Sequence, residues 1–172
     1  MKISDILDSN LVEVRLKSRR IHEVVWELLG VLKREGKLKD FEKAAAGIRE
    51  KEGVPPSIIG GAAIFHFTVD GVTEPVASLG VSTIGIDFKP LDPTPIHIVF
   101  LLLSPPEESE THLQLLARAE GLLRNKEFRK RLVASLTREK LFGEVLEAES
   151  KGWDAFVNLS INEVLAELLT SP

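Results

Sequence analysis

Apolar and polar residues alternate at the start of the chain and then change to helical spacing. Residues 11–16 have a period of two, which is typical of a strand covered on one face, and they predict an edge or near-edge strand. Helical spacing over residues 21–34 predicts a helix capped by Ser18. A second helix is expected to follow the cap residue Asp40 and to end at Gly53.

The middle of the chain has the period and the glycine content of strands. We expect short strands near residues 62–68 and 75–82, joined by a turn at Asp70-Gly71. A proline-containing loop is expected over residues 87–95. The run 96–103 is apolar on both faces and therefore predicts the central strand of a sheet.

The remainder of the chain has mainly helical patterns. Helices are predicted over residues 105–124, near 126–135 and 137–149, and as an amphipathic helix around 161–169. Strands together with helices on both sides of a sheet indicate an α/β fold. The specific expectation is a three-layer α/β/α sandwich with a mixed sheet of four or five strands.

Composition narrows the domain organisation and the function classes. The 172 residues are 44% hydrophobic and 28% charged, which fits a globular chain able to bury a full core. We expect one domain over residues 1–150, with residues 151–172 as a C-terminal extension whose amphipathic helix packs on it. The formal net charge of -4 argues against a nucleic-acid-binding surface.

Two absences in the sequence limit its chemistry and location. There is no cysteine, which excludes disulfides, thiolate catalysis and cysteine-ligated metal. No apolar run is long enough for a signal peptide or a membrane helix, so we expect a cytoplasmic protein without membrane insertion. Nucleophilic chemistry near neutral pH is then left to histidine, or to a hydroxyl activated by one.

The chain has four histidines, and two of them stand out by position. His66 lies in a glycine-rich segment that is predicted to be a strand. His112 lies in the first turn of the helix that follows the central strand, where backbone N–H groups favour an anion. The two segments are separated by that buried strand, and together they indicate a phosphate site.

The residues alone also allow plainer interpretations. His66 fits a buried structural histidine equally well, and His112 fits a polar surface residue. His97, inside the apolar strand, is expected to be a hydrogen-bonded structural histidine, whereas His22 is expected on the solvated face of the first helix. No phosphate-binding glycine motif is present, and no spacing completes a metal site, so no metal is expected.

Four stretches, taken in their order and spacing, carry a further indication. They are residues 36–40 with 48–51, residues 61–66, residues 85–88 with 95–105, and residues 112–117 with Phe128-Arg129. Over residues 4 to about 149 the chain resembles the type-2 enzyme IIA domain of the bacterial phosphoenolpyruvate-dependent phosphotransferase system. This family includes the mannitol/fructose and the nitrogen-regulatory IIA proteins.

The resemblance implies a phosphotransferase that acts as a phosphohistidine carrier. His66 would accept the phosphoryl group from the phosphocarrier HPr and pass it to a IIB-type acceptor, which must be a separate partner because this chain has no cysteine. His112 matches the second active-site histidine, and Arg49 and Thr68 are expected to stabilise the phosphate. No cofactor is implied. The alternatives are a nitrogen-regulatory type of protein, whose phosphorylation state controls partner proteins, and an interaction domain without phosphorylation.

Two departures from the family pattern surround the expected nucleophile. Phe65 stands where the family has proline, and Phe67 replaces a small residue. Proline fixes φ, so its loss is expected to change how His66 is presented. We also expect one of the two phenylalanines to be exposed beside His66, as part of the surface on which the donor protein docks.

Overall fold

A five-stranded mixed sheet forms the centre of the molecule. The structure is a computed structural model that describes residues 1–154 and 169. The strand order is β1-β4-β5-β3-β2. In chain order, the strands are β1 (Val12–Glu13), β2 (Ser57–Ile59), β3 (Ala62–Thr68), β4 (Val76–Ile86) and β5 (Ile96–Ser104). Strand β5 pairs parallel with β3 and antiparallel with β4.

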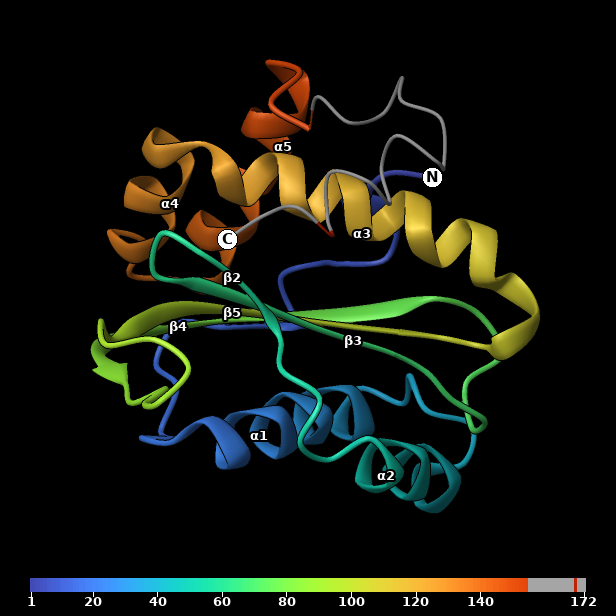
Figure 1. The fold of residues 1–172 in the computed structure, drawn as a ribbon. Helices are drawn as coiled ribbons and strands as arrows, with labels where there is room; N and C mark the ends of the chain where they lie inside the picture. The colour runs from blue at the N-terminus through green and yellow to red at the C-terminus, as the bar shows by residue number, and fades with distance from the viewer. Residues whose placement is uncertain (155–168, 170–172) are drawn as a thin grey trace.

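Helices cover both faces of this sheet, so the predicted three-layer α/β/α sandwich is confirmed. The helices are α1 (Ile21–Arg34), α2 (Phe41–Glu50), α3 (Ser109–Arg124), α4 (Lys126–Val133) and α5 (Arg138–Ser150). Figure 1 shows α1 and α2 on one face of the sheet and α3, α4 and α5 on the other. Among the described residues, none of these helices has the length and apolar character needed to cross a lipid bilayer.

The helix caps were predicted with mixed success. Asp40 caps α2 as expected, because its side chain accepts a hydrogen bond from the Lys43 N–H at 3.1 Å. The expectation that Ser18 caps α1 is wrong, since the helix begins after Arg20. The Ser18 hydroxyl instead donates to Glu27 Oε1 at 2.6 Å, a contact that ties the chain before the helix to the helix itself.

The predicted central strand is confirmed as β5, and it separates β3 from β4, the two strands that precede it in the chain. A turn is present at Asp70-Gly71, but β3 and β4 are not neighbours, because β5 lies between them. Gly71 has a φ of 97°, and a Cβ at this position would lie 2.3 Å from the Asp40 carbonyl oxygen. The turn therefore packs against the start of α2.

The segment that follows α5 is bound to α3 by an ion pair. The Arg118 guanidinium on α3 forms an ion pair with Asp154 at 2.7 Å, and both side chains are largely buried. The amphipathic helix expected around residues 161–169 lies outside the described residues, apart from residue 169. Its packing on the domain stays a prediction.

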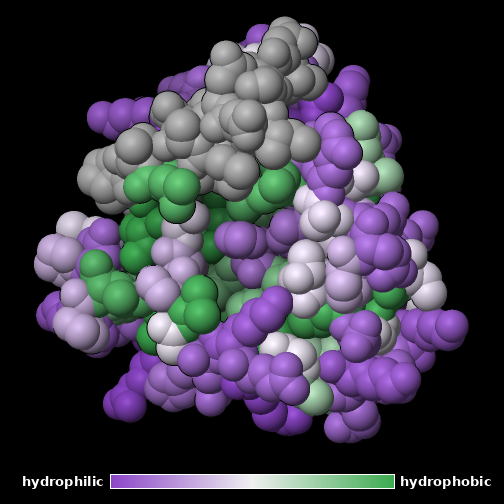
Figure 2. Space-filling model, turned by 45° about the vertical axis from the view of Figure 1, so that its right-hand side comes forward, coloured by the Kyte–Doolittle hydropathy of each residue, from purple (hydrophilic) through white to green (hydrophobic). Residues whose placement is uncertain are grey.

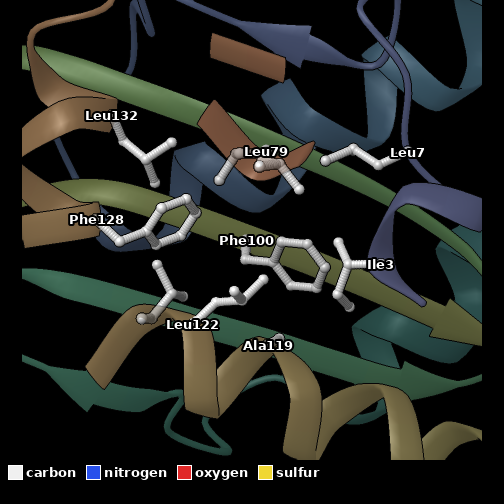
Figure 3. Close-up of a pocket in the computed structure, with 10 residues that line it drawn as sticks. Ile3, Leu7, Leu79, Phe100, Ala119, Leu122, Phe128 and Leu132 are labelled. Atoms are coloured by element: carbon white, nitrogen blue, oxygen red, sulfur yellow. The ribbon is translucent and has the colours of Figure 1, made fainter. Parts of the chain in front are cut away.

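The core between the sheet and α3, α4 and α5 is closely packed. Figure 3 shows Leu79 and Phe100 from the sheet meeting Leu122 from α3 and Phe128 from α4, around a cavity of only about 10 Å³. This cavity has room for about one water and no polar lining, so it is packing space and not a site. On the outer surface, Figure 2 shows apolar residues gathered in patches between hydrophilic ones.

Replacing Phe128 with alanine should lower the free energy of unfolding by about 3–5 kcal/mol, because it removes a large side chain from a core that cannot fully collapse. Urea denaturation at neutral pH measures this loss. The matched control is Leu136→Ala, at a side chain that is 79% exposed, with an expected change within about 0.5 kcal/mol. Equal effects of the two substitutions would contradict this view of the core.

Candidate functional site

The two histidines singled out by the sequence are in direct contact. His66 Nδ1 lies 3.1 Å from His112 Nε2, and the ring centroids are 5.2 Å apart. His66 is exposed on β3, whereas His112 is only 4% exposed in the first turn of α3. The two rings therefore lie as close together as expected, but they bond directly to each other, and contact of one phosphate with both rings stays a prediction.

The topology explains why these rings meet. Strands β3 and β5 run parallel, and His66 is paired with Leu102 near their carboxyl ends. The chain leaves β5 after Ser104, passes through a single 3-10 turn (Pro106–Glu108) and enters α3 above the sheet. The first turn of α3 thus returns over the end of β3, and it brings His112 onto the face of the sheet from which His66 projects.

Ser104 fixes the inner ring. Its hydroxyl lies 2.7 Å from His112 Nδ1, and the residue is completely buried at the end of β5. Each nitrogen of His112 therefore has a partner, Ser104 on one side and His66 on the other. His66 Nδ1 is also engaged, whereas His66 Nε2 has no hydrogen-bond partner within the described part of the chain.

Both imidazoles are biased toward the neutral form. Burial, followed by the charges of His66 and Lys51, lowers the pKa of His112 to about 4. Desolvation and then the charge of Lys51 lower the pKa of His66 as well. At pH 7 the pair is therefore uncharged, and a neutral imidazole can act as a nucleophile through a free nitrogen.

Lys51 is the cation that the structure brings to this site. Its ammonium group donates to the Thr68 carbonyl oxygen at 3.0 Å and lies 3.5 Å from the Thr68 hydroxyl. Strand β2 pairs with β3 only over residues 62–64, which leaves the outer edge of β3 open to Lys51 near Thr68. Thr68 lies two residues after His66 and on the same face of the strand.

Sequence reasoning did not select Lys51, although this residue ends one of the four family-like stretches. It selected Arg49 instead. The Arg49 guanidinium lies 5.0 Å from the centre of the Trp26 ring, in a cation–π arrangement on α1 and α2. Contact between Arg49 and a phosphate stays a prediction. The sequence feature that could have pointed to Lys51 is its position directly after the end of α2.

The expectation for Phe65 and Phe67 is wrong. The two residues are only 6% and 8% exposed, so neither side chain forms an exposed surface next to His66. Residues i and i+2 of a strand share one face, so both rings point to the α1 and α2 side while His66 points to the other. The Phe65 ring packs on the Phe88 ring, with centroids 6.2 Å apart. Phe65 itself lies inside strand β3.

The remaining two histidines have the expected structural roles. His97 Nδ1 donates to the Ser82 carbonyl oxygen at 2.8 Å, and the His22 side chain is 65% exposed on α1.

Within the described residues, no three His, Asp or Glu side chains form a group that could hold a metal ion. The candidate site therefore consists of His66, His112, Ser104, Thr68 and Lys51. This arrangement suits attack of a neutral imidazole on an anionic electrophile.

Comparison with known proteins gives a consistent result. A family model described as "Phosphoenolpyruvate-dependent sugar phosphotransferase system, EIIA 2" matches residues 5–148. The fructose-specific EIIABC component of the phosphotransferase system of Bacillus subtilis is 32% identical over 160 residues, and the match covers 92% of this chain and 23% of that protein. The fructose-specific EIIA component of Haloferax volcanii is 31% identical over 135 residues, with 78% of this chain and 75% of that protein covered.

Solved structures show the same fold. The crystal structure of the nitrogen regulatory protein IIA-Ntr from Neisseria meningitidis superposes with a TM-score of 0.68 at 24% identity, covering 83% of this chain and 98% of that one. The chain thus spans nearly the whole of a solved IIA-Ntr structure but about a quarter of the Bacillus relative.

Titration of the two rings tests the geometry of the pair. We expect the NMR signals of His112 to titrate with a pKa of about 4 in the folded protein and near 6.5 in urea, where burial is lost. Lys51→Gln should raise the pKa of both His66 and His112, because it removes a nearby positive charge. Lys37→Gln, at an exposed lysine on a loop, is the matched control. A His112 that titrates at its ordinary pKa in the folded protein would contradict the buried pair.

Proposed function

Because the chain belongs to the EIIA type-2 family of the phosphoenolpyruvate-dependent sugar phosphotransferase system, we propose that it carries a phosphoryl group on Nε2 of His66. The observation that carries this proposal is the contact between the two imidazoles. It occupies His66 Nδ1 and leaves Nε2 directed away from its partner. The donor in this proposal is a phosphohistidine protein of the HPr type.

The hydrogen bonds provide a consistent proton arrangement for this step. In the proposed arrangement Ser104 accepts from His112 Nδ1–H at 2.7 Å, and His112 Nε2 accepts from His66 Nδ1–H at 3.1 Å. In this tautomer His66 Nε2 bears a lone pair, which is what a nucleophile requires. In the opposite arrangement Ser104 would donate to His112 Nδ1 and the proton of His66 would lie on Nε2, so the proposed transfer uses the arrangement in which Ser104 accepts.

Transfer then proceeds as an in-line displacement. The lone pair of His66 Nε2 forms the new N–P bond while the N–P bond of the donor breaks, and the electron pair of that bond returns to the donor imidazole. His66 keeps its Nδ1 proton and becomes a phosphorylated, positively charged ring. His112 stabilises this charge by accepting the Nδ1–H hydrogen bond, since it is itself neutral at pH 7.

Lys51 supplies positive charge near the transferred group. Its ammonium group is held at the edge of β3 by the Thr68 carbonyl oxygen, and it lies 3.5 Å from the Thr68 hydroxyl, which is on the same face of the strand as His66. A phosphoryl group spreads negative charge over its oxygens in the transition state, and a positioned cation stabilises that charge. Thr68 serves in this proposal as a holder of Lys51 and as a hydroxyl that can donate to the phosphate.

Transfer to a IIB-type acceptor is the proposed next step. Two relatives with fructose-specific names support this sugar-transport branch. The second candidate is a regulatory role, in which the phosphorylation state controls a partner protein. A nitrogen regulatory protein of Pseudomonas aeruginosa, 32% identical over 110 residues, supports this candidate. Both roles use the same phosphohistidine, and they differ only in the protein that reads it.

Phosphorylation by a reconstituted donor system tests the assignment of His66. Incubation with phosphoenolpyruvate, enzyme I and HPr should add one acid-labile phosphoryl group, measured by intact-protein mass spectrometry. His66→Ala should abolish the addition, whereas His112→Ala should slow it by about tenfold to a hundredfold, because it removes one stabilising contact. Stable phosphorylation of His66→Ala would overturn the proposal.

The same assay separates Lys51 from Arg49. Lys51→Gln should slow phosphorylation of His66 by about a hundredfold, as expected for loss of one positioned electrostatic group, and Lys51→Arg should restore part of the rate. Arg49→Gln is the informative comparison, because the Arg49 guanidinium lies on Trp26. A loss confined to Arg49→Gln would show that Arg49, and not Lys51, faces the phosphate.

A further inference from the structure

A second concave site lies on the opposite face of the sheet from the histidine pair. It is an open groove of about 300 Å³ between α1, the end of α2 and the loop after β4. Phe65 and Phe67 face it from β3, and Trp26 and Phe88 add two more aromatic rings to its walls. This volume is at the lower end of the range of about 300–1,000 Å³ found for small-molecule sites.

The rim of the groove leaves apolar groups in contact with water. Val54 is 63% exposed and Leu91 is 48% exposed, and they belong to two separate segments that line the groove. Exposed aliphatic side chains around a concave aromatic surface gain free energy when a hydrocarbon group covers them. The groove is therefore suited to an apolar group that enters from solvent.

Charge gives the groove a preference for an anion. Lys51 and Lys89 line it, and Glu52 is the one acidic side chain among its lining residues, so two positive charges face one negative charge. The whole chain has a formal net charge of -4, so a local excess of cationic groups departs from the rest of the molecule. A ligand with an apolar body and one negative group would match both features.

We propose that this groove binds a small amphipathic carboxylate, with its hydrocarbon part on the aromatic rings of Trp26, Phe65 and Phe67 and its carboxylate at the lysines that line the groove. Medium-chain fatty acids and arylalkanoates belong to this chemical class. Binding at the groove does not depend on the phosphoryl transfer proposed above, because the side chains of Phe65 and Phe67 lie on the opposite face of β3 from the side chain of His66.

Lys51 connects this groove to the histidine pair. Its side chain lines the groove, while its ammonium group binds Thr68 at the edge of β3 and its charge acts on both imidazoles. A carboxylate bound near Lys51 offsets that charge. Occupancy of the groove should consequently be detected at His112 as a higher pKa.

Calorimetric titration with decanoate and with 4-phenylbutyrate tests the proposal, and decanol serves as the neutral counterpart of decanoate. We expect saturable binding at one site, at least tenfold tighter for decanoate than for decanol, with quenching or enhancement of Trp26 fluorescence. Trp26→Phe should remove the fluorescence change. Equal binding of decanol and decanoate would overturn the carboxylate specificity, and no saturable binding of either acid would overturn the site.

Two rim substitutions and two matched controls locate the binding. Leu91→Glu and Lys89→Glu should each weaken decanoate binding by at least tenfold. Leu136→Glu, at another exposed leucine, and Lys37→Glu, at another exposed lysine, should leave it unchanged. All four positions are exposed, so the variants should fold, and circular dichroism checks this. Equal weakening by the controls would show that decanoate binds elsewhere or without specificity.

Discussion

The parallel pairing of β3 with β5 is the constraint on which the site depends. In this register His66 lies beside Leu102, and Thr68 lies beside Ser104. Side chains alternate between the faces of a strand, so a shift of one residue would turn His66 toward α1 and α2. The same pairing places Ser104 under the first turn of α3. One register therefore sets the positions of His66, its partner ring and the serine that holds the partner.

The histidine pair combines an exposed ring with a buried one, and the buried ring limits the orientation of the exposed ring. A single exposed imidazole is free to rotate and to bind protons near pH 7. His112 restricts His66 through the 3.1 Å contact, and burial keeps His112 neutral. The buried ring can do this because Ser104 satisfies its second nitrogen, which avoids the cost of an unpaired polar group inside the protein.

The features that the sequence predicted correctly are those encoded by local patterns. The cap at Asp40 and the apolar run that becomes β5 depend on neighbouring residues, and the fold class follows from the order of such elements. The cap at Ser18 failed because Glu27, nine residues away, binds its hydroxyl. The expectation that Phe65 or Phe67 is exposed failed because residues two apart on a strand share a face, and here that face is buried under α1 and α2. Lys51 was missed because its role depends on an open strand edge, which no local pattern reveals.

Strand β2 is short, and the edge of β3 that it leaves uncovered is where Lys51 lies between the two faces of the sheet. Because β2 covers only the first part of β3, the outer edge near Thr68 has no strand partner among the described residues. Unpaired carbonyl groups at such an edge need another donor, and Lys51 provides it. A lysine at a sheet edge is accessible from both faces, so its stem can line the aromatic groove while its charge acts on the imidazoles. The edge that β2 leaves open thus becomes the route by which one face of the sheet can influence the other.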